Sequence, residues 1–525
     1  MNGNTRRKQF LVFLLASLFL AMLSAQEDES ETHFKIQSII YHPEGKIQAS
    51  ALNRYLRIDT TRIYDSQEEL EAALEFIGQR LENSRFFEQI SHSYTVIAHT
   101  EDGINLVEAE YSFKVSNSLL IFPSPSFDSN TGTKLSLILR DQNFMGLMRP
   151  LMFSIIGQLG TEDEPENTSK VTGGFNFFYD YPFSVGKTQN SWFNLFNFAW
   201  TLGDDSPSFD FRSGVNVGIP VGKRKSLLTF NFTQAMVHDF YYKKYDDAFY
   251  FVESGSVSLP LTVAHITNTT PLVYTPFIRT SYTWDTNGID EANTKLNKTP
   301  RLSVGQTTSI MHIDWKGNFR NGDAFLTTQS ISRDFHAKDT DKMIIPLFSI
   351  NWRHYKSWKY AGIYTNFYFF ATHNDSINVG NRLRGILDNQ RYRSYNIDID
   401  NYALATPSAF IANIDLPLHI ITTDWQSWFH IEDTSSGFGK LLGYMDFELQ
   451  LSPFVDIALI KNRATGRAYS FEEGLYSIGV EMLVYPKKWK SYVVRASLGF
   501  DMSKHRDWRS PRKDYELFVG IGHHF

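Results

Sequence analysis

The carboxyl terminus carries the pattern that most restricts the fold of this chain. From Tyr515 to Phe525, mostly apolar or aromatic residues such as Leu517 alternate with small or polar ones such as Glu516 and Gly520. A period of two residues marks a strand with one apolar face. A strand of this kind that ends on an aromatic terminal residue fits a transmembrane barrel, whose outer side meets lipid and whose inner side meets water or polar groups.

The amino terminus predicts an exported protein. Three basic residues at 6–8 precede an apolar run at 10–23, and small residues follow as far as Ala25. Residues 1–25 therefore resemble a secretory signal peptide, and the run is too short for a convincing membrane helix. No later stretch reaches the roughly 18 consecutive apolar residues that a spanning helix needs. None of the 525 residues is cysteine, so we expect packing and hydrogen bonds, not disulfides, to stabilise the protein.

Composition agrees with a barrel and argues against a nucleic-acid partner. Aromatic residues make up 15% of the chain, which suits the aromatic girdles of barrel strands. The formal net charge is −6, and no basic patch interleaved with aromatic residues is present. We therefore expect no nucleic-acid partner.

Residues 34–115 predict a small α/β domain. The expected order is a strand at 34–41, a helix at 49–56, a longer helix that Asp65 or Ser66 caps, and a hairpin of strands. The longer helix carries an apolar stripe at helical spacing. The stripe consists of Leu70, Ala73, Leu74, Ile77 and Leu81. About 80 residues are enough for a small independent domain.

Residues 118–525 predict a barrel. Helical periodicity largely disappears, and alternating strands are separated by polar loops rich in Asn and Asp, such as 161–169 and 285–297. With membrane strands of about 9 to 11 residues, this length accommodates about 16 strands. The predicted fold is a transmembrane antiparallel β-barrel preceded by one small α/β domain.

Five segments, in order along residues 34–525, carry the motifs of one family. Residues 132–146 contain a strand and a turn of the D-x-N-x-x-G kind, 381–386 contain an Arg-Gly motif, and 454–458 read F-x-D-x-A. Together with the domain at 34–115 and the terminal Phe525, they resemble the outer-membrane β-barrel assembly superfamily, whose bacterial members include BamA and TamA. The resemblance identifies 34–115 as a single POTRA domain and Phe525 as an insertion signal.

The resemblance also implies a lock between the long sixth extracellular loop and the inner wall. In the family's pattern Arg384 supplies the guanidinium, Gly385 lets the loop turn tightly, and Asp456 on the thirteenth strand is the acceptor. Asp415 is a second possible acceptor. An arginine suits this task because its planar fork binds a carboxylate at two points and stays charged. The alternative is that Arg384 is a solvated loop arginine without such a role.

A second candidate site is the seam that closes the barrel. Pro123 and Pro125 lack a backbone N–H, and residues two apart in a strand direct their N–H groups toward the same neighbour. If that neighbour is the last strand, which contains Gly520 and Gly522, the seam is weakened and could open laterally. The other interpretation is that the prolines only stiffen the link from the small domain.

The predicted function follows from the resemblance. The sequence contains no recognised hydrolase, phosphate-loop or metal-binding motif, so we expect no enzyme, cofactor or metal. The resemblance implies a factor that inserts or translocates polypeptides at the outer membrane of a diderm bacterium. Its partners would be outer-membrane lipids, unfolded outer-membrane or secreted polypeptides bound by the periplasmic POTRA domain through β-augmentation, and accessory periplasmic or inner-membrane proteins. The alternatives are a two-partner-type secretion pore and a passive channel or surface protein on the same scaffold.

Overall fold

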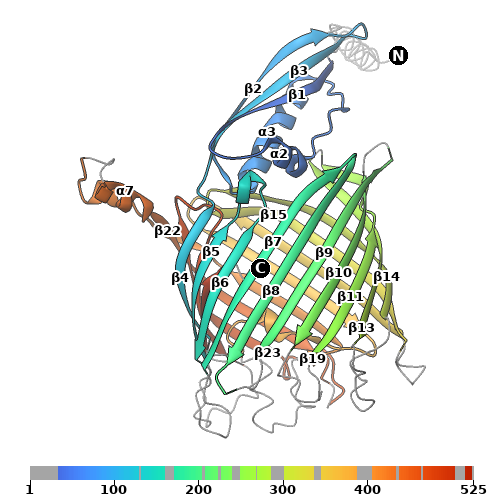
Figure 1. Cartoon of the computed structure of the whole chain (residues 1–525), viewed down its shortest axis with the longest axis vertical. Coiled ribbons are helices and arrows are strands. Elements are labelled where there is room, and N and C mark those ends of the chain that lie inside the picture. Colours follow the sequence, from blue (N-terminus) through green and yellow to red (C-terminus); the bar gives the residue numbers. More distant parts are fainter. Residues whose placement is uncertain are drawn as a thin grey trace, which may run out of the picture.

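A computed structural model describes residues 33–128, 132–159, 171–203, 207–222, 226–238, 249–267, 269–284, 301–335, 344–386, 405–432, 437–462, 465–502 and 515–522. Figure 1 shows two parts, a small α/β unit and a wide β-barrel at one end of which the unit rests. The signal peptide predicted at 1–25 and the terminal Phe525 lie outside the described residues.

The N-terminal unit has the predicted order of strand, two helices and two strands. Its elements are β1 (His33–Glu44), α2 (Ala49–Leu56), α3 (Gln67–Asn83), β2 (Phe87–His99) and β3 (Ile104–Val115). In the sheet, β3 lies between β1, which runs parallel to it, and β2, which runs antiparallel. This order leaves β2 at one edge of the sheet.

Local signals fix the start of α3. The side-chain oxygen of Ser66 accepts a hydrogen bond from the backbone N–H of Glu69 at 3.1 Å. The carboxylate of Glu69 accepts one from the backbone N–H of Asp65 at 2.9 Å. The first bond satisfies a donor that the first helical turn leaves unpaired, and the second holds the residue before the cap, so Ser66 is the cap of the two candidates.

A compact apolar core joins α3 to the sheet. Leu70, Leu74 and Leu81 of α3 are fully buried, as are Ile36 and Tyr111 of the sheet. The hydroxyl of Tyr111 donates to the carbonyl of Leu74 at 2.9 Å, so its polar atom is satisfied. Burying each such side chain contributes about 1.5–3 kcal/mol, which gives the unit a core of its own.

The barrel wall consists of antiparallel strands that neighbour one another in chain order. They are β4 (Leu119–Asp128), β5 (Gly132–Asp141), β6 (Leu151–Leu159), β7 (Val171–Val185), β8 (Thr188–Thr201), β9 (Ser208–Val221), β10 (Ser226–His238), β11 (Phe249–Ser258), β12 (Leu261–Thr267), β13 (Thr270–Trp284), β14 (Arg301–Lys316), β15 (Phe319–Asp334), β16 (Ile344–Ser357), β17 (Gly362–Thr372), β20 (Ser408–Asp415), β21 (Leu418–Thr422), β22 (Phe447–Ile460), β23 (Leu475–Pro486), β24 (Val494–Asp501) and β25 (Tyr515–Ile521).

The remaining elements are short. They are η1 (Phe144–Gly146), β18 (Ile377–Asn378), η4 (Gly380–Arg382), β19 (Ala405–Thr406), α6 (Trp425–Trp428) and α7 (Gly437–Tyr444). Within the described part of the chain, no helix combines the length and the apolar character that crossing a bilayer requires.

Two wall strands are interrupted at a proline. Pro260 separates β11 from β12, which both pair with β13, and Pro417 separates β20 from β21, which both pair with β22. Counting each interrupted strand once reduces the 20 segments of the ring to about 18 strands among the described residues. The predicted antiparallel barrel is confirmed, with two more strands than expected. Short connections such as 186–187 and 317–318 use few residues, so the chain is long enough for the two additional strands.

The outer surface of the wall is apolar at alternate positions. Ile121 of β4, Leu135 and Leu137 of β5 and Ile155 of β6 are all at least half exposed, whereas Ser136 is buried. Alternation along a strand places such residues on one face of the sheet. An outward apolar band on a closed barrel is the surface that hydrocarbon covers in a membrane.

The N-terminal unit rests on the barrel end that we call the proximal rim (Figure 1). Asn83 at the end of α3 donates to Asp314 of β14 at 2.9 Å and accepts from the backbone N–H of Trp315 at 2.9 Å. Arg85 lies over the Trp315 ring at 4.2 Å and donates to the carbonyl of Lys490 in the β23–β24 turn at 2.5 Å.

A further contact lies at the turn after β5, which was predicted from its D-x-N-x-x-G-like sequence. Asn143 donates to the carbonyl of Lys46 at 3.0 Å and accepts from the backbone N–H of Met148 at 2.9 Å. Gly146 has a φ of +76°, and a Cβ there would lie 3.1 Å from the Cα of Ile47. Since β5 and β14 are far apart around the ring, the unit extends across the proximal opening.

Candidate functional site: a buried loop lock and the barrel seam

The part of the β17–β20 connection that the structure describes after β17, residues 373–386, folds into the barrel. Its apolar side chains pack against inward-facing residues of the wall. The buried cluster consists of Phe370, Val379, Leu383, Ile386, Ala409, Ile411, Ala458 and Ile460. On β22, Val455 points the opposite way and is 39% exposed, which identifies the side of Asp456 as the inner side.

Arg384 lies in this loop and is held by Asp456. Its backbone N–H donates to Oδ2 of Asp456 at 2.8 Å, its Nε to the same oxygen at 3.0 Å, and its Nη2 to Oδ1 at 2.7 Å. Arg384 is 4% exposed and Asp456 is fully buried. The side-chain contacts form the two-point fork expected of an arginine and a carboxylate, and the backbone adds a third bond.

Two further carboxylates face Arg384. Its Nη1 lies 2.7 Å from Oδ1 of Asp415 and 3.6 Å from Oε2 of Glu481. The guanidinium carbon lies 3.7 Å from the ring centroid of Phe454, within range of a cation–π interaction. Glu481 also pairs with Nη1 of Arg495 at 3.2 Å. Arginines and acids thus alternate in one network, which is what makes burial of so many charges tolerable.

Two buried asparagines orient the acceptor. Asn413 of β20 donates to Oδ1 of Asp456 at 2.9 Å and to the carbonyl of Arg382 at 2.7 Å. Asn366 of β17 in turn donates to Oδ1 of Asn413 at 2.9 Å. The amides fix the carboxylate and satisfy a loop carbonyl inside the wall, where an unpaired polar group would be costly.

Gly385 closes the loop against the last two strands. It has a φ of +80°, and a Cβ there would lie 2.6 Å from the carbonyl carbon of Gly499 in β24, so only glycine fits. Its N–H donates to Oε2 of Glu516 in β25 at 2.6 Å. Arg384 and Gly385 therefore tie the loop to β20, β22, β23, β24 and β25.

The barrel seam lies between β25 and β4. Among the described residues these strands share one pair, Phe518 opposite Asp128. On its other side β4 pairs with β5 over its whole length, Pro123 and Pro125 included. Because proline has no N–H for that ladder, both nitrogens must face away from β5 and toward β25. The seam edge of β4 therefore lacks two donors, and lateral opening of the seam stays a prediction.

The two glycines named with the seam have contacts with β24 and the residue before it. Gly520 is opposite Arg495 of β24, and a Cβ on Gly520 would lie 2.6 Å from the ring of Phe518. Gly522 has a φ of +112°, and its N–H donates to the carbonyl of Val493 at 3.0 Å. The insertion signal at Phe525 falls outside the described residues and stays a prediction.

Several members of the network were not identified from the sequence. They are Glu481, Arg495, Gly499 and Glu516. Glu516 lies on the face of the last strand that was predicted to be the inner one. The alternation of residues along that strand could therefore have identified it as a candidate. For the others no local signal exists, because their contact with the loop depends on how the barrel closes.

The arrangement holds a loop through fixed, paired charges. Among the residues that the structure describes, no three His, Asp or Glu side chains are grouped so as to bind a metal ion. The carboxylates around Arg384 are instead occupied by arginine and amide donors.

No protein-family model and no curated protein matches the sequence. Among solved structures, the chain is similar to CdiB from Acinetobacter baumannii, with a TM-score of 0.45 and 11% identity over 93% of this chain and 74% of that one. BamA from Haemophilus ducreyi lacking POTRA domains 1–3 gives 0.40 and 12% over 93% and 84%. Wzi, a carbohydrate-binding outer-membrane β-barrel from Escherichia coli, gives 0.34 and 11% over 91% and 93%.

Proposed function

We propose that this chain is an outer-membrane factor of the BamA/TamA type that inserts or translocates other polypeptides. The observation that carries the proposal is the asymmetry of the seam. On one side the loop of Arg384 braces β20–β25, and on the other β4 presents an edge that lacks two donors at Pro123 and Pro125. A sheet edge with few ladder bonds is a template on which an incoming strand can pair.

In this proposal the N-terminal unit is a single POTRA domain in the periplasm. Its strand β2 is at the edge of the sheet, and Val96 and Ile97 on that strand are 42% and 49% exposed. An extended client could add to this edge by β-augmentation. Accessory periplasmic or inner-membrane proteins would dock on the same exposed unit.

A two-partner-type secretion pore is the second candidate, and the width of the ring favours it. About 18 strands enclose a lumen wide enough for a channel. However, the β14–β15 turn reaches across that lumen, where Asn318 donates to Glu448 of β22 at 2.8 Å. Passage of a client would therefore require the turn to move as well as the loop.

A covalent clamp across the seam tests the proposal. Extending the register of Phe518 and Asp128 by four residues places Gly522 opposite Ser124. Because the chain has no cysteine, the double substitution Ser124→Cys/Gly522→Cys introduces its only thiols. In cells depleted of the native protein, we expect the oxidised variant to fail to restore the outer-membrane proteome and a reductant to rescue it.

A matched clamp elsewhere in the wall is the control. Ser136 and Ile156 are paired across β5 and β6, so cysteines at these positions join two strands that already form a ladder. This variant should restore the proteome in both redox states. Full activity with the seam clamped would refute insertion at the seam. Loss of one secreted client with an unchanged membrane proteome would favour the two-partner pore.

A further inference from the structure

A short helical hairpin projects sideways from the proximal rim. It consists of α6 and α7, between β21 and β22, and Figure 1 shows α7 outside the barrel wall at the level of the rim. Asp446 fixes its base, because its carboxylate accepts from the backbone N–H of Trp425 at 3.0 Å and its carbonyl from that of Lys487 at 2.9 Å. The hairpin is thus attached firmly at one end.

One face of the hairpin is apolar and exposed. Phe438 and Leu441 of α7 are 63% and 54% exposed, and Met445 just beyond the helix is 55% exposed. Their spacing of three and four residues places them on one side of α7. Trp428 and Phe429 at the end of α6 are also exposed, at 44% and 60%. Apolar groups gathered on a projecting element mark a contact surface.

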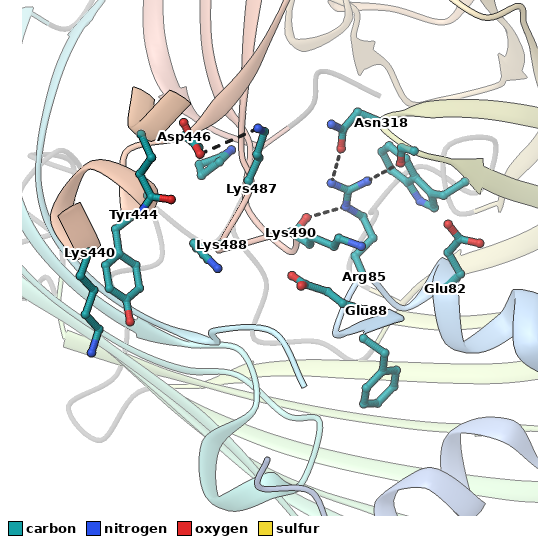
Figure 2. Close-up of a pocket in the computed structure, with 16 residues that line it drawn as sticks. Glu82, Arg85, Glu88, Asn318, Lys440, Tyr444, Asp446, Lys487, Lys488 and Lys490 are labelled. Carbon is teal, nitrogen blue, oxygen red and sulfur yellow. Dashed lines mark hydrogen bonds and ion pairs between the residues drawn. The ribbon is translucent and has the colours of Figure 1, made fainter. Parts of the chain in front are cut away.

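A cavity of mixed charge, lined by lysines and by Glu82 and Glu88, lies beside the hairpin. Lys440, on the side of α7 away from the apolar stripe, lines this cavity of about 620 Å³ between the hairpin, the β23–β24 turn and the N-terminal unit. Figure 2 shows Lys487, Lys488 and Lys490 around the same cavity. Of these four lysines, only Lys487 has a carboxylate partner within the described part of the chain, Asp446 at 3.9 Å.

We propose that α6–α7 is a membrane-surface anchor whose stripe of Phe438, Leu441 and Met445 is seated in the bilayer leaflet at the proximal rim. The hairpin continues the lipid-facing wall, since Leu418 and Ile420 of β21, which leads into α6, are themselves exposed. A helix with an apolar face and a lysine-bearing polar face lies in the plane of the membrane interface. Lys440 on the polar face of α7 complements the phosphates of phospholipid headgroups.

The position of the anchor ties it to the seam. The ring of Tyr444 in α7 lies 5.8 Å from that of Trp489, whose Nε1 donates to the carbonyl of Leu119, the first residue of β4. That bond is 2.9 Å long. The hairpin therefore fixes the height of the start of β4 relative to the lipid surface.

The absence of cysteine makes a direct test possible. We would attach an environment-sensitive fluorophore to the single substitutions Leu441→Cys and Lys440→Cys in the full chain, reconstituted in vesicles of phosphatidylethanolamine and phosphatidylglycerol. Ile121→Cys on the outer wall and Ile97→Cys on β2 serve as lipid-facing and water-facing references, since both native side chains are exposed. We expect spin-labelled lipid to quench position 441 as it quenches 121. Aqueous iodide should quench position 440 several-fold more than 441.

Three outcomes decide the proposal. Equal iodide quenching at 440 and 441 would overturn it. Shielding of 441 from both quenchers, with a doubled mass in detergent, would overturn it in favour of a second copy of the chain. A further variant, Phe438→Ser/Met445→Ser with the label at 441, should lose lipid quenching while the heat-modifiable mobility of the barrel is unchanged, which separates lost anchoring from misfolding.

Discussion

Arg384 concentrates the stability of the loop in one side chain. Replacing it by alanine would leave Asp456, Asp415 and Glu481 facing one another in a buried site. Because Arg384 is 4% exposed and Asp456 is not exposed, we expect Arg384→Ala to cost about 3–5 kcal/mol, the range for a broken buried pair. Unfolding in urea, followed by heat-modifiable gel mobility, measures the cost, and Arg384→Lys should rescue poorly because a point charge cannot reproduce the fork.

A double-mutant cycle isolates the pair itself. If Arg384 and Asp456 act through one interaction, the double alanine variant should be little worse than either single variant, since one interaction cannot be lost twice. Protease sensitivity of the loop is the readout. Strictly additive losses would show that the two residues contribute independently and that the contact is not a lock.

Gly385 offers a second prediction with a matched control. Gly385→Ala introduces a Cβ 2.6 Å from the carbonyl carbon of Gly499, whereas Gly466, which has a similar positive φ of +72°, has no heavy atom within 4 Å of such a Cβ. Gly466→Ala should therefore cost only the backbone strain, about 1–2 kcal/mol. Gly385→Ala should cost more and should release the loop to protease. Equal thermal stabilities would mean that the close approach is unimportant.

At the scale of elements, we expect acid to destabilise the N-terminal end of α3. The hydrogen bond from the backbone of Asp65, followed by the contact with Arg62, holds the pKa of Glu69 below its ordinary value of 4.5. A carboxylate with a lowered pKa stabilises the folded state above its unfolded pKa, and this contribution is lost as the pH falls through the lower folded value. We expect Glu69→Gln to flatten the acid limb of thermal stability in the N-terminal unit, measured by circular dichroism. An unchanged acid limb would contradict this assignment.

Replacing the two prolines of β4 should stabilise the barrel and lower its activity. Pro123→Ala/Pro125→Ala restores two N–H donors directed toward β25. We expect a longer ladder at the seam, a higher temperature for the loss of heat-modifiable mobility and lower assembly activity. Pro182→Ala in β7, away from the seam, is the control and should change neither. Unchanged behaviour of the double variant would mean that the prolines only stiffen the link to the N-terminal unit.

The sequence predicted elements best where the signals are local. The helix at Ala49–Leu56 was predicted, and the cap of the next helix was narrowed to Asp65 or Ser66, because caps, turns and helical spacing act within a few residues. The number of barrel strands was underestimated, since it depends on how tightly each turn closes. Arg384 and Asp456 were paired only through a family resemblance, because no short-range rule joins positions on a loop and a later strand. Glu516 was placed on the correct face but without a partner.

At the scale of the whole molecule, Arg85 joins the N-terminal unit to the rim. Its guanidinium stacks on Trp315 and donates to the carbonyl of Lys490. We expect Arg85→Ala to free the unit while both parts stay folded. Pulsed-EPR distances between spin labels on Ile97→Cys and Lys316→Cys should then broaden, whereas Arg62→Ala, whose partner Glu69 lies within the unit, should leave them narrow. A narrow distribution in both variants would show that the other contacts suffice.

The loop network also has a consequence for the order in which the chain folds. Arg384 and Asp456 are 72 residues apart, and Gly385 and Glu516 are 131 apart, whereas the seam joins Asp128 to Phe518 across most of the chain. Closing a longer loop costs more chain entropy. At the seam, only one residue pair among the described residues offsets that cost. We therefore expect the carboxyl-terminal strands to gather around the arginine into a stable half-ring early in biogenesis. Ring closure at β4 would be the last step of folding and the first to reverse on unfolding.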